Sequence, residues 1–136
     1  MKYPIKMIQS NIDNNWVISV PDLPGCQVID HSIDNALEKI STVIAEHLTI
    51  LAEYGETIPH GSLLEQHIEQ NKGKDYSWAI VDFDIIPYLG KSHKINVTLP
   101  ELLIKQIDDK VKKSELYSTR SGFIASACLA QLTKTN

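Results

Sequence analysis

The stretch Lys94-Ile95-Asn96-Val97-Thr98-Leu99-Pro100 decides the fold of the C-terminal part of this 136-residue chain. Apolar and polar residues alternate along it, which is typical of a β-strand with one covered face. A single strand cannot satisfy its own backbone hydrogen-bonding groups, and only helical patterns follow this one. We therefore expect the same strand of a second copy of the chain to pair with it.

The two paired strands would form a ribbon with two different faces. The inner face would carry Ile95, Val97 and Leu99. The outer face would carry Lys94, Asn96 and Thr98. Side chains of these polar types read base edges in the major groove of DNA, and that groove admits a two-stranded ribbon. The strand therefore predicts both a homodimer and a DNA contact.

Two helical patterns follow the strand. Pro100 is favoured at the first position of the first helix, which would run to about Lys113 with one apolar face made of Leu103, Ile104, Ile107 and Val111. After a turn over residues 114–118, Thr119 is suited to cap the second helix, whose apolar face would comprise Phe123, Ile124, Ala127, Cys128 and Leu132. Free backbone N–H groups at the start of that helix, beside Thr119, Arg120 and Ser121, predict a grip on DNA phosphate.

Charge divides the chain into two parts. The whole chain has a net charge of −4. Residues 91–136 contain eight Lys or Arg and four Asp or Glu, a net charge of +4, which leaves −8 for residues 1–90. The basic part suits a polyanion, whereas the acidic part would repel one and attract a basic partner.

Residues 1–85 predict a separate α+β domain with the element order β-β-β-α-(α)-β. We expect strands over 3–9, 16–20, 26–30 and 76–85, because these segments alternate or are rich in apolar residues between turn-forming residues. Residues 86–93 would be a linker to the C-terminal domain, which would span residues 94–136.

Two helices are expected between the third and fourth strands of that domain. Ser32 is placed to cap a long helix with a continuous apolar stripe, which would end near Tyr54 and Gly55. Ser62 and Glu65 have the spacing of a capping box and would open a shorter helix that ends near Gln70.

Catalysis is not expected of this chain. Two-metal nucleases need several converging carboxylates, and the first strand contains none. Asp82 and Asp84 would alternate onto one face of the last strand and are the acids that a nuclease would have to use. The five histidines have no metal-ligand spacing. Cys26 and Cys128 lack such spacing too, and we expect both to be reduced packing residues, with no metal or cofactor.

The expected cellular location follows from two sequence patterns that the chain lacks. No apolar run approaches the roughly 20 residues of a membrane span, and the N-terminus has no long apolar core typical of a signal peptide. We therefore expect a cytoplasmic protein without a membrane partner.

Two parts of the chain resemble known families. The sequences K-I-N-V-T-L-P-E-L-L-I-K-Q-I-D from Lys94 and S-T-R-S-G-F-I from Ser118 resemble the ribbon-helix-helix family of dimeric bacterial repressors. Earlier in the chain, W-V-I-S-V-P-D-L-P-G-C from Trp16, D-N-A-L from Asp34 and Y-G-E-T-I-P from Tyr54 resemble the N-terminal domain of HicB antitoxins. That domain is similar to proteins described as having a degenerate ribonuclease H-like fold.

The resemblance implies an antitoxin of a type II toxin–antitoxin system. Such a protein neutralises HicA, a small basic ribonuclease toxin that cleaves mRNA, and represses its own operon by binding operator double-stranded DNA. Asp22, Tyr54 and Trp78 are candidate toxin contacts by residue type. Each also has a structural explanation, as a turn former, a helix-end residue and a core residue respectively.

Two other functions remain open on the sequence alone. One is a stand-alone ribbon-helix-helix regulator whose N-terminal domain binds a small ligand or another protein. The other is a nuclease that uses Asp82 or Asp84.

Overall fold

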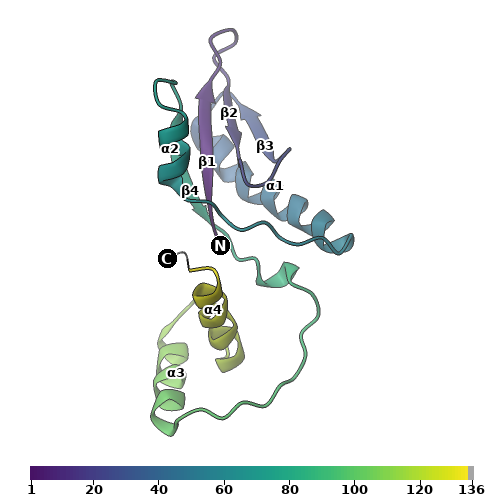
Figure 1. The fold of residues 1–136 in the computed structure, drawn as a ribbon, viewed down its shortest axis with the longest axis vertical. Helices are drawn as coiled ribbons and strands as arrows, with labels where there is room; N and C mark the ends of the chain where they lie inside the picture. Colours follow the sequence, from purple (N-terminus) through teal and green to yellow (C-terminus); the bar gives the residue numbers. More distant parts are fainter. Residues whose placement is uncertain (135–136) are drawn as a thin grey trace. The chain divides into compact units, whose positions relative to one another are not determined.

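The chain forms two compact units in the computed structural model, which describes residues 1–134 (Figure 1). Unit 1 comprises residues 1–89, and unit 2 begins at Gly90. Unit 1 contains a sheet of four strands, whereas the secondary structure of unit 2 over the described residues is helical. The chain therefore has the α+β character that its sequence predicts.

The sheet of unit 1 is antiparallel throughout, with the strand order β3-β2-β1-β4. Its strands are β1 (Lys2–Gln9), β2 (Trp16–Ser19), β3 (Gln27–Asp30) and β4 (Ser77–Asp82). Alternate residues of β1, namely Tyr3, Ile5 and Met7, share one face and are buried. The other face of β1 carries Lys2, Pro4 and Lys6, which lie opposite Asp82, Ile80 and Trp78 of β4.

The two helices of unit 1 lie on opposite faces of this sheet (Figure 1). Helix α1 (Ile33–Glu53) packs on β2 and β3 and buries Ala36, Ile40, Ile44 and Leu48. Its predicted cap is confirmed, since Ser32 Oγ accepts a hydrogen bond from the backbone N–H of Asn35 at 3.3 Å. Helix α2 (Leu64–Gln70) lies against β4.

Strand β4 is shorter than its predicted range of 76–85. Asp84 Oδ1 accepts a hydrogen bond from the backbone N–H of Ile86 at 3.1 Å. This local turn competes with strand pairing and leads into a 3₁₀ helix, η1 (Ile86–Tyr88), which contacts α1. Residues 86–88 therefore belong to unit 1 rather than to an extended linker. Asp84 lies beyond the strand, so the prediction that it shares a strand face with Asp82 is wrong.

The predicted capping box of α2 is also wrong. The residue that caps α2 is Leu63, which makes no side-chain capping bond. Ser62 instead donates from its backbone N–H and its Oγ to Asp22 Oδ2, at 2.9 and 3.0 Å. A carboxylate 40 positions earlier in the sequence thus takes the place of the local acceptor that the motif predicts.

Unit 2 contains the two predicted helices, α3 (Glu101–Lys113) and α4 (Arg120–Leu132). The predicted cap of α4 is confirmed, because Thr119 Oγ1 accepts a hydrogen bond from the backbone N–H of Gly122 at 3.0 Å. Among the described residues of unit 2, only Ile107 is a buried apolar side chain, at 6% exposure. A two-helix unit has too few residues to cover its own apolar surface.

The expected strand over 94–99 does not form within one chain, because the described residues supply no partner strand for it. Ile95 is 79% exposed and Val97 is 62% exposed. Part of the apolar face of α4 is likewise uncovered: Leu132 is 80% exposed, whereas Phe123 and Ile124 are half-buried. Cys128 is exposed there, so its expected packing role is not met within one chain, whereas Cys26 is buried.

Candidate functional site

The predicted DNA-contacting residues of unit 2 lie in two places, the segment that precedes α3 and the N-terminal end of α4. Lys94, Asn96 and Thr98 are exposed in the irregular segment that precedes α3. Thr119, Arg120 and Ser121 are exposed at the N-terminal end of α4. Thr119 Oγ1 accepts the capping hydrogen bond of α4 from Gly122, which leaves its O–H free to donate to a phosphate.

Arg120, the only arginine of the chain, already has a partner within unit 2. Its Nε and Nη2 donate to Asp108 Oδ1 and Oδ2 of α3, at 3.0 and 2.8 Å. These hydrogen bonds, and secondarily the opposite charges, lower the pKa of Asp108 and raise the pKa of Arg120. The pair fixes the guanidinium beside the start of α4. Sequence reasoning missed Asp108, because its 12-residue separation from Arg120 matches no helical spacing rule.

A series of contacts in unit 1, two hydrogen bonds and one ring stack, connects two of the three candidate toxin contacts. Asp22 accepts from Ser62, and Ser62 Oγ lies 2.5 Å from His67 Nε2. The ring of His67 stacks on Trp78, with centroids 5.2 Å apart. Through these contacts the loop after β2, the start of α2 and strand β4 are held together. Ser62 and His67 are the members that the sequence did not reveal.

Asp22, Ser62 and His67 are not connected in the order of a hydrolase triad. In such a triad the histidine lies between the acid and the serine, and the acid orients it. Here the serine lies between the carboxylate and the imidazole. The arrangement therefore explains why Asp22 and Trp78 are held in place, and gives neither of them a catalytic role.

Tyr54, the third candidate toxin contact, is not part of this series of contacts. It follows the last residue of α1, and its side chain is 78% exposed. Gly55 follows with a φ of 68°, a backbone conformation that favours glycine at the end of a helix. Tyr54 is thus held at a defined helix end while its ring remains accessible.

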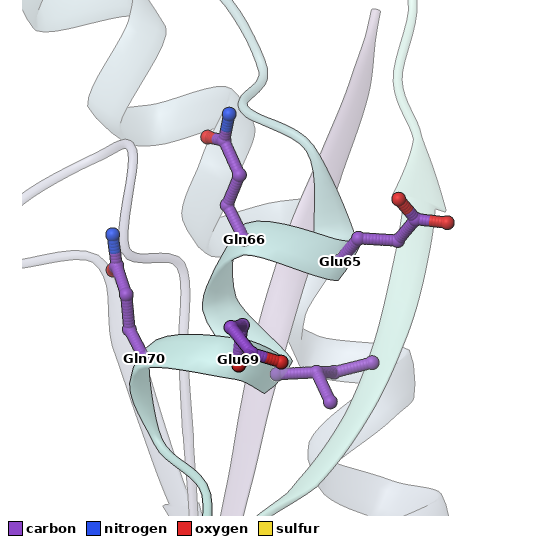
Figure 2. A pocket seen from close by; sticks show the side chains of 5 residues that line it. Glu65, Gln66, Glu69 and Gln70 are labelled. Carbon is purple, nitrogen blue, oxygen red and sulfur yellow. The ribbon is translucent and has the colours of Figure 1, made fainter.

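A shallow hollow runs beside α2 (Figure 2) and is lined by Glu65, Gln66, Ile68, Glu69 and Gln70. All five side chains come from one helix, and Glu69 forms an ion pair with Lys72 at 3.0 Å. Small-molecule sites instead enclose a ligand between groups that converge from several elements. We therefore assign no ligand site to it.

Across residues 1–134, no three His, Cys, Asp or Glu side chains are grouped closely enough to hold a metal ion. None of the helices in that range combines the length and apolar character needed to cross a membrane.

Tyr3 is a buried titratable group of unit 1. Its hydroxyl donates to the backbone carbonyl of Pro59 at 2.8 Å. Burial, and secondarily the charge of Asp22, raises the pKa of Tyr3 from its ordinary value of 10.0 to about 12.

Alkaline pH is therefore expected to destabilise unit 1. The folded state holds the Tyr3 proton more tightly than the unfolded state, so the free energy of unfolding should fall as pH rises from about 10 towards 12. Burial also raises the pKa of Cys26 to about 11, which acts in the same direction. Urea unfolding at pH 8 and pH 11 should show a smaller alkaline loss for Tyr3→Phe than for the wild type. The control variant Tyr54→Phe, at an exposed position, should lose as much free energy of unfolding at pH 11 as the wild type. If Tyr3→Phe also lost as much, the alkaline destabilisation would not come from Tyr3.

Comparison with known proteins places these features in a family. A model of the family described as HicB_like antitoxin of bacterial toxin-antitoxin system matches residues 3–128. The crystal structure of the Burkholderia pseudomallei antitoxin HicB is 30% identical, with a TM-score of 0.71 over 97% of this chain and 98% of that one. A HicB3-containing match, titled HicA3 and HicB3 toxin-antitoxin complex, is 20% identical, with a TM-score of 0.52 over 62% of this chain and 99% of that one, and supports the fold alone.

A curated relative extends the match along the sequence. An uncharacterized 14.9 kDa protein of Haemophilus phage HP1, from the rep-hol intergenic region, is 33% identical over 97% of this chain and 98% of its own length. The family match covers both units, and the resemblance of the first unit to HicB is thereby confirmed. The chain belongs to the family of HicB-like antitoxins of bacterial toxin–antitoxin systems.

Proposed function

We propose that this antitoxin neutralises a HicA-like, mRNA-cleaving toxin by direct binding and represses its own operon through unit 2. The observation that carries the proposal is the division of charge. Unit 1 has a net charge of −8, and the residues from Gly90 onward have a net charge of +4. The two units therefore suit partners of opposite charge, a basic protein and a nucleic acid. Both partners would be met in the cytoplasm.

Unit 1 would block the toxin by occupying the surface on which the toxin holds RNA. Its carboxylates would attract the basic toxin over distance and raise the association rate, while apolar contacts supply most of the affinity. A protein that covers a cationic RNA-binding surface needs no catalytic group of its own. The acidic composition of unit 1 supports this role.

Unit 2 would bind the operator as a homodimer of ribbon-helix-helix domains. A second copy would pair with residues 94–99 and cover the side chains of Ile95 and Val97, which are exposed in one chain. Lys94, Asn96 and Thr98 would then contact the bases, and the N-terminal end of α4 would contact phosphate. The uncovered apolar side chains of unit 2 support this dimer.

Co-expression with the small open reading frame next to this gene tests the toxin half of the proposal. We expect the neighbouring protein alone to arrest growth, and the full antitoxin chain to relieve the arrest and to co-purify with it. A neighbouring protein that arrests growth but neither binds this chain nor is relieved by it would refute direct neutralisation.

Arg120→Ala and Asn96→Ala test the DNA half, because their expected effects differ in kind. Arg120→Ala should weaken binding to operator and to random DNA alike, and lower the salt slope by about one phosphate contact. Asn96→Ala should reduce the discrimination between operator and random DNA by about 1–3 kcal/mol. Electrophoretic mobility shifts at several salt concentrations would measure both effects.

Asp108→Asn is the control for the phosphate assignment. This variant breaks the charged pair with Arg120 but keeps the guanidinium, so operator binding should be retained or strengthened. If Asp108→Asn weakened binding as much as Arg120→Ala, Arg120 would serve to join α3 and α4 rather than to bind phosphate.

A further inference from the structure

The negative charge of unit 1 is concentrated in one segment. Residues 40–71 contain no Lys or Arg and carry Glu46, Glu53, Glu56, Glu65 and Glu69. The lysines that border this segment are both paired, Lys39 with Asp30 at 2.6 Å and Lys72 with Glu69 at 3.0 Å. The segment comprises the second half of α1, the return to the sheet and α2.

The C-terminal end of α1 adds to that negative charge. Unpaired carbonyl groups give the end of a helix a partial negative charge, which basic side chains in the last turn normally balance. The last turn of α1 contains no basic residue, while Glu53 ends the helix and Glu56 follows it. These carboxylates are unfavourably placed for the stability of the helix, and a cationic partner would make their position favourable.

Exposed apolar side chains lie at the same end of the helix. Ile50 is 53% exposed and Tyr54 is 78% exposed, and their spacing of four residues makes them neighbours on the helix surface. Glu46 and Glu53 lie four residues before Ile50 and three after it, and so border this pair. An aromatic and an aliphatic side chain within a charged rim are typical of the residues that dominate protein–protein affinity.

We propose that this α1-end face, defined as Glu46, Ile50, Glu53, Tyr54 and Glu56, is the surface on which the basic toxin docks. The inference rests on the proposed function, and of the three candidate toxin contacts it selects Tyr54 rather than Asp22 or Trp78. The same face of a second copy is a poor occupant, because pairing two such faces would bring like charges together.

Another exposed apolar side chain, Ile80 of β4, has charges of both signs around it. Ile80 is 50% exposed and lies opposite Pro4, on the sheet face that also carries Lys2 and Lys6. Asp82 lies opposite Lys2 on that face, and Lys6 Nζ lies 5.1 Å from the ring centroid of Tyr76. A basic toxin would therefore be attracted less strongly there than to the end of α1, which has no Lys or Arg nearby in the sequence.

Binding of the full chain to the purified product of the neighbouring small open reading frame tests the inference. The double variant Ile50→Ala, Tyr54→Ala should bind that protein about 100-fold more weakly, mainly through faster dissociation. The control Ile29→Ala, Ile80→Ala removes side chains that are 58% and 50% exposed, and should change the affinity less than about threefold. Circular dichroism should show both variants folded, because all four side chains are exposed.

Two charge-matched variants test the location of the carboxylates. Glu53→Gln, Glu56→Gln and Glu65→Gln, Glu69→Gln change the net charge equally. The first pair should slow association about fivefold at low salt and the second pair less, with the difference narrowing at high salt. Equal slowing by both pairs would mean that net charge alone attracts the toxin, and would overturn the proposed location.

The binding measurements distinguish failure of the proposed function from failure of the proposed docking face. If the wild-type chain does not bind the neighbouring protein, the proposed function fails and this inference fails with it. If the wild type binds and the Ile50→Ala, Tyr54→Ala variant binds equally well, only the inference fails. A change in the oligomeric state of this variant without toxin would show that the face joins copies of the chain, which would also overturn the inference.

Discussion

Replacing Ile95 and Val97 with aspartate is expected to make the protein monomeric and to lower its operator affinity by roughly 100-fold or more. Both side chains are exposed in one chain, so the charges cost little before association. In the proposed dimer they lie between two copies, where four carboxylates without partners would be buried close together. Sedimentation would measure the mass, and a mobility shift the operator affinity.

The added negative charge needs its own control, because it would also weaken DNA binding without any change in assembly. Leu116→Asp with Gln131→Asp adds the same charge at exposed positions outside the predicted ribbon. This control should remain dimeric and lose only the electrostatic part of the affinity. An Ile95→Asp, Val97→Asp variant that stayed dimeric would show that the chain associates through another surface.

Gly61→Ala is expected to destabilise unit 1 by about 3 kcal/mol or more, at the upper end of the usual cost of overpacking. A Cβ atom at this position would lie 1.8 Å from the carbonyl oxygen of Lys2 and 2.9 Å from its carbonyl carbon. Both are backbone atoms of the first residue of β1, so the strand would have to move. The two tryptophans, Trp16 and Trp78, both lie in unit 1, and their fluorescence during urea unfolding would report on that unit alone.

Gly25→Ala separates this steric effect from ordinary backbone strain. Gly25 has a φ of 87°, and nothing lies within 4 Å of an added Cβ atom. The cost there should be only about 1 kcal/mol, that of placing a side chain in the left-handed region. If Gly61→Ala cost no more than Gly25→Ala, the close approach of Gly61 to β1 would be contradicted.

Local signals in the sequence were sufficient for most of the elements. The caps at Ser32 and Thr119 are predicted correctly, because in each the side-chain oxygen accepts a hydrogen bond from a backbone N–H only three residues later. The antitoxin family was predicted from short motifs and is confirmed by comparison. The ribbon-helix-helix assignment and the named DNA contacts stay predictions.

The errors arose where distant residues compete for the same group. Ser62 has the spacing of a capping box, yet Asp22 takes its hydrogen bonds from the loop after β2. Arg120 stays a predicted phosphate contact, and its pairing with Asp108 is a contact that the sequence does not indicate. No periodicity reports a contact across 40 or 12 residues, so these partners could be found only in the folded chain.

The incomplete strand at residues 94–99 also bears on how repression would respond to the amount of protein. Because each chain supplies half of the proposed ribbon, the species that binds the operator forms only when two chains meet. At concentrations below the dimerisation constant, operator occupancy would rise with the square of the antitoxin concentration. The operon would then remain active while antitoxin is scarce and be silenced over a narrow range of concentration, without any cooperativity between operator sites.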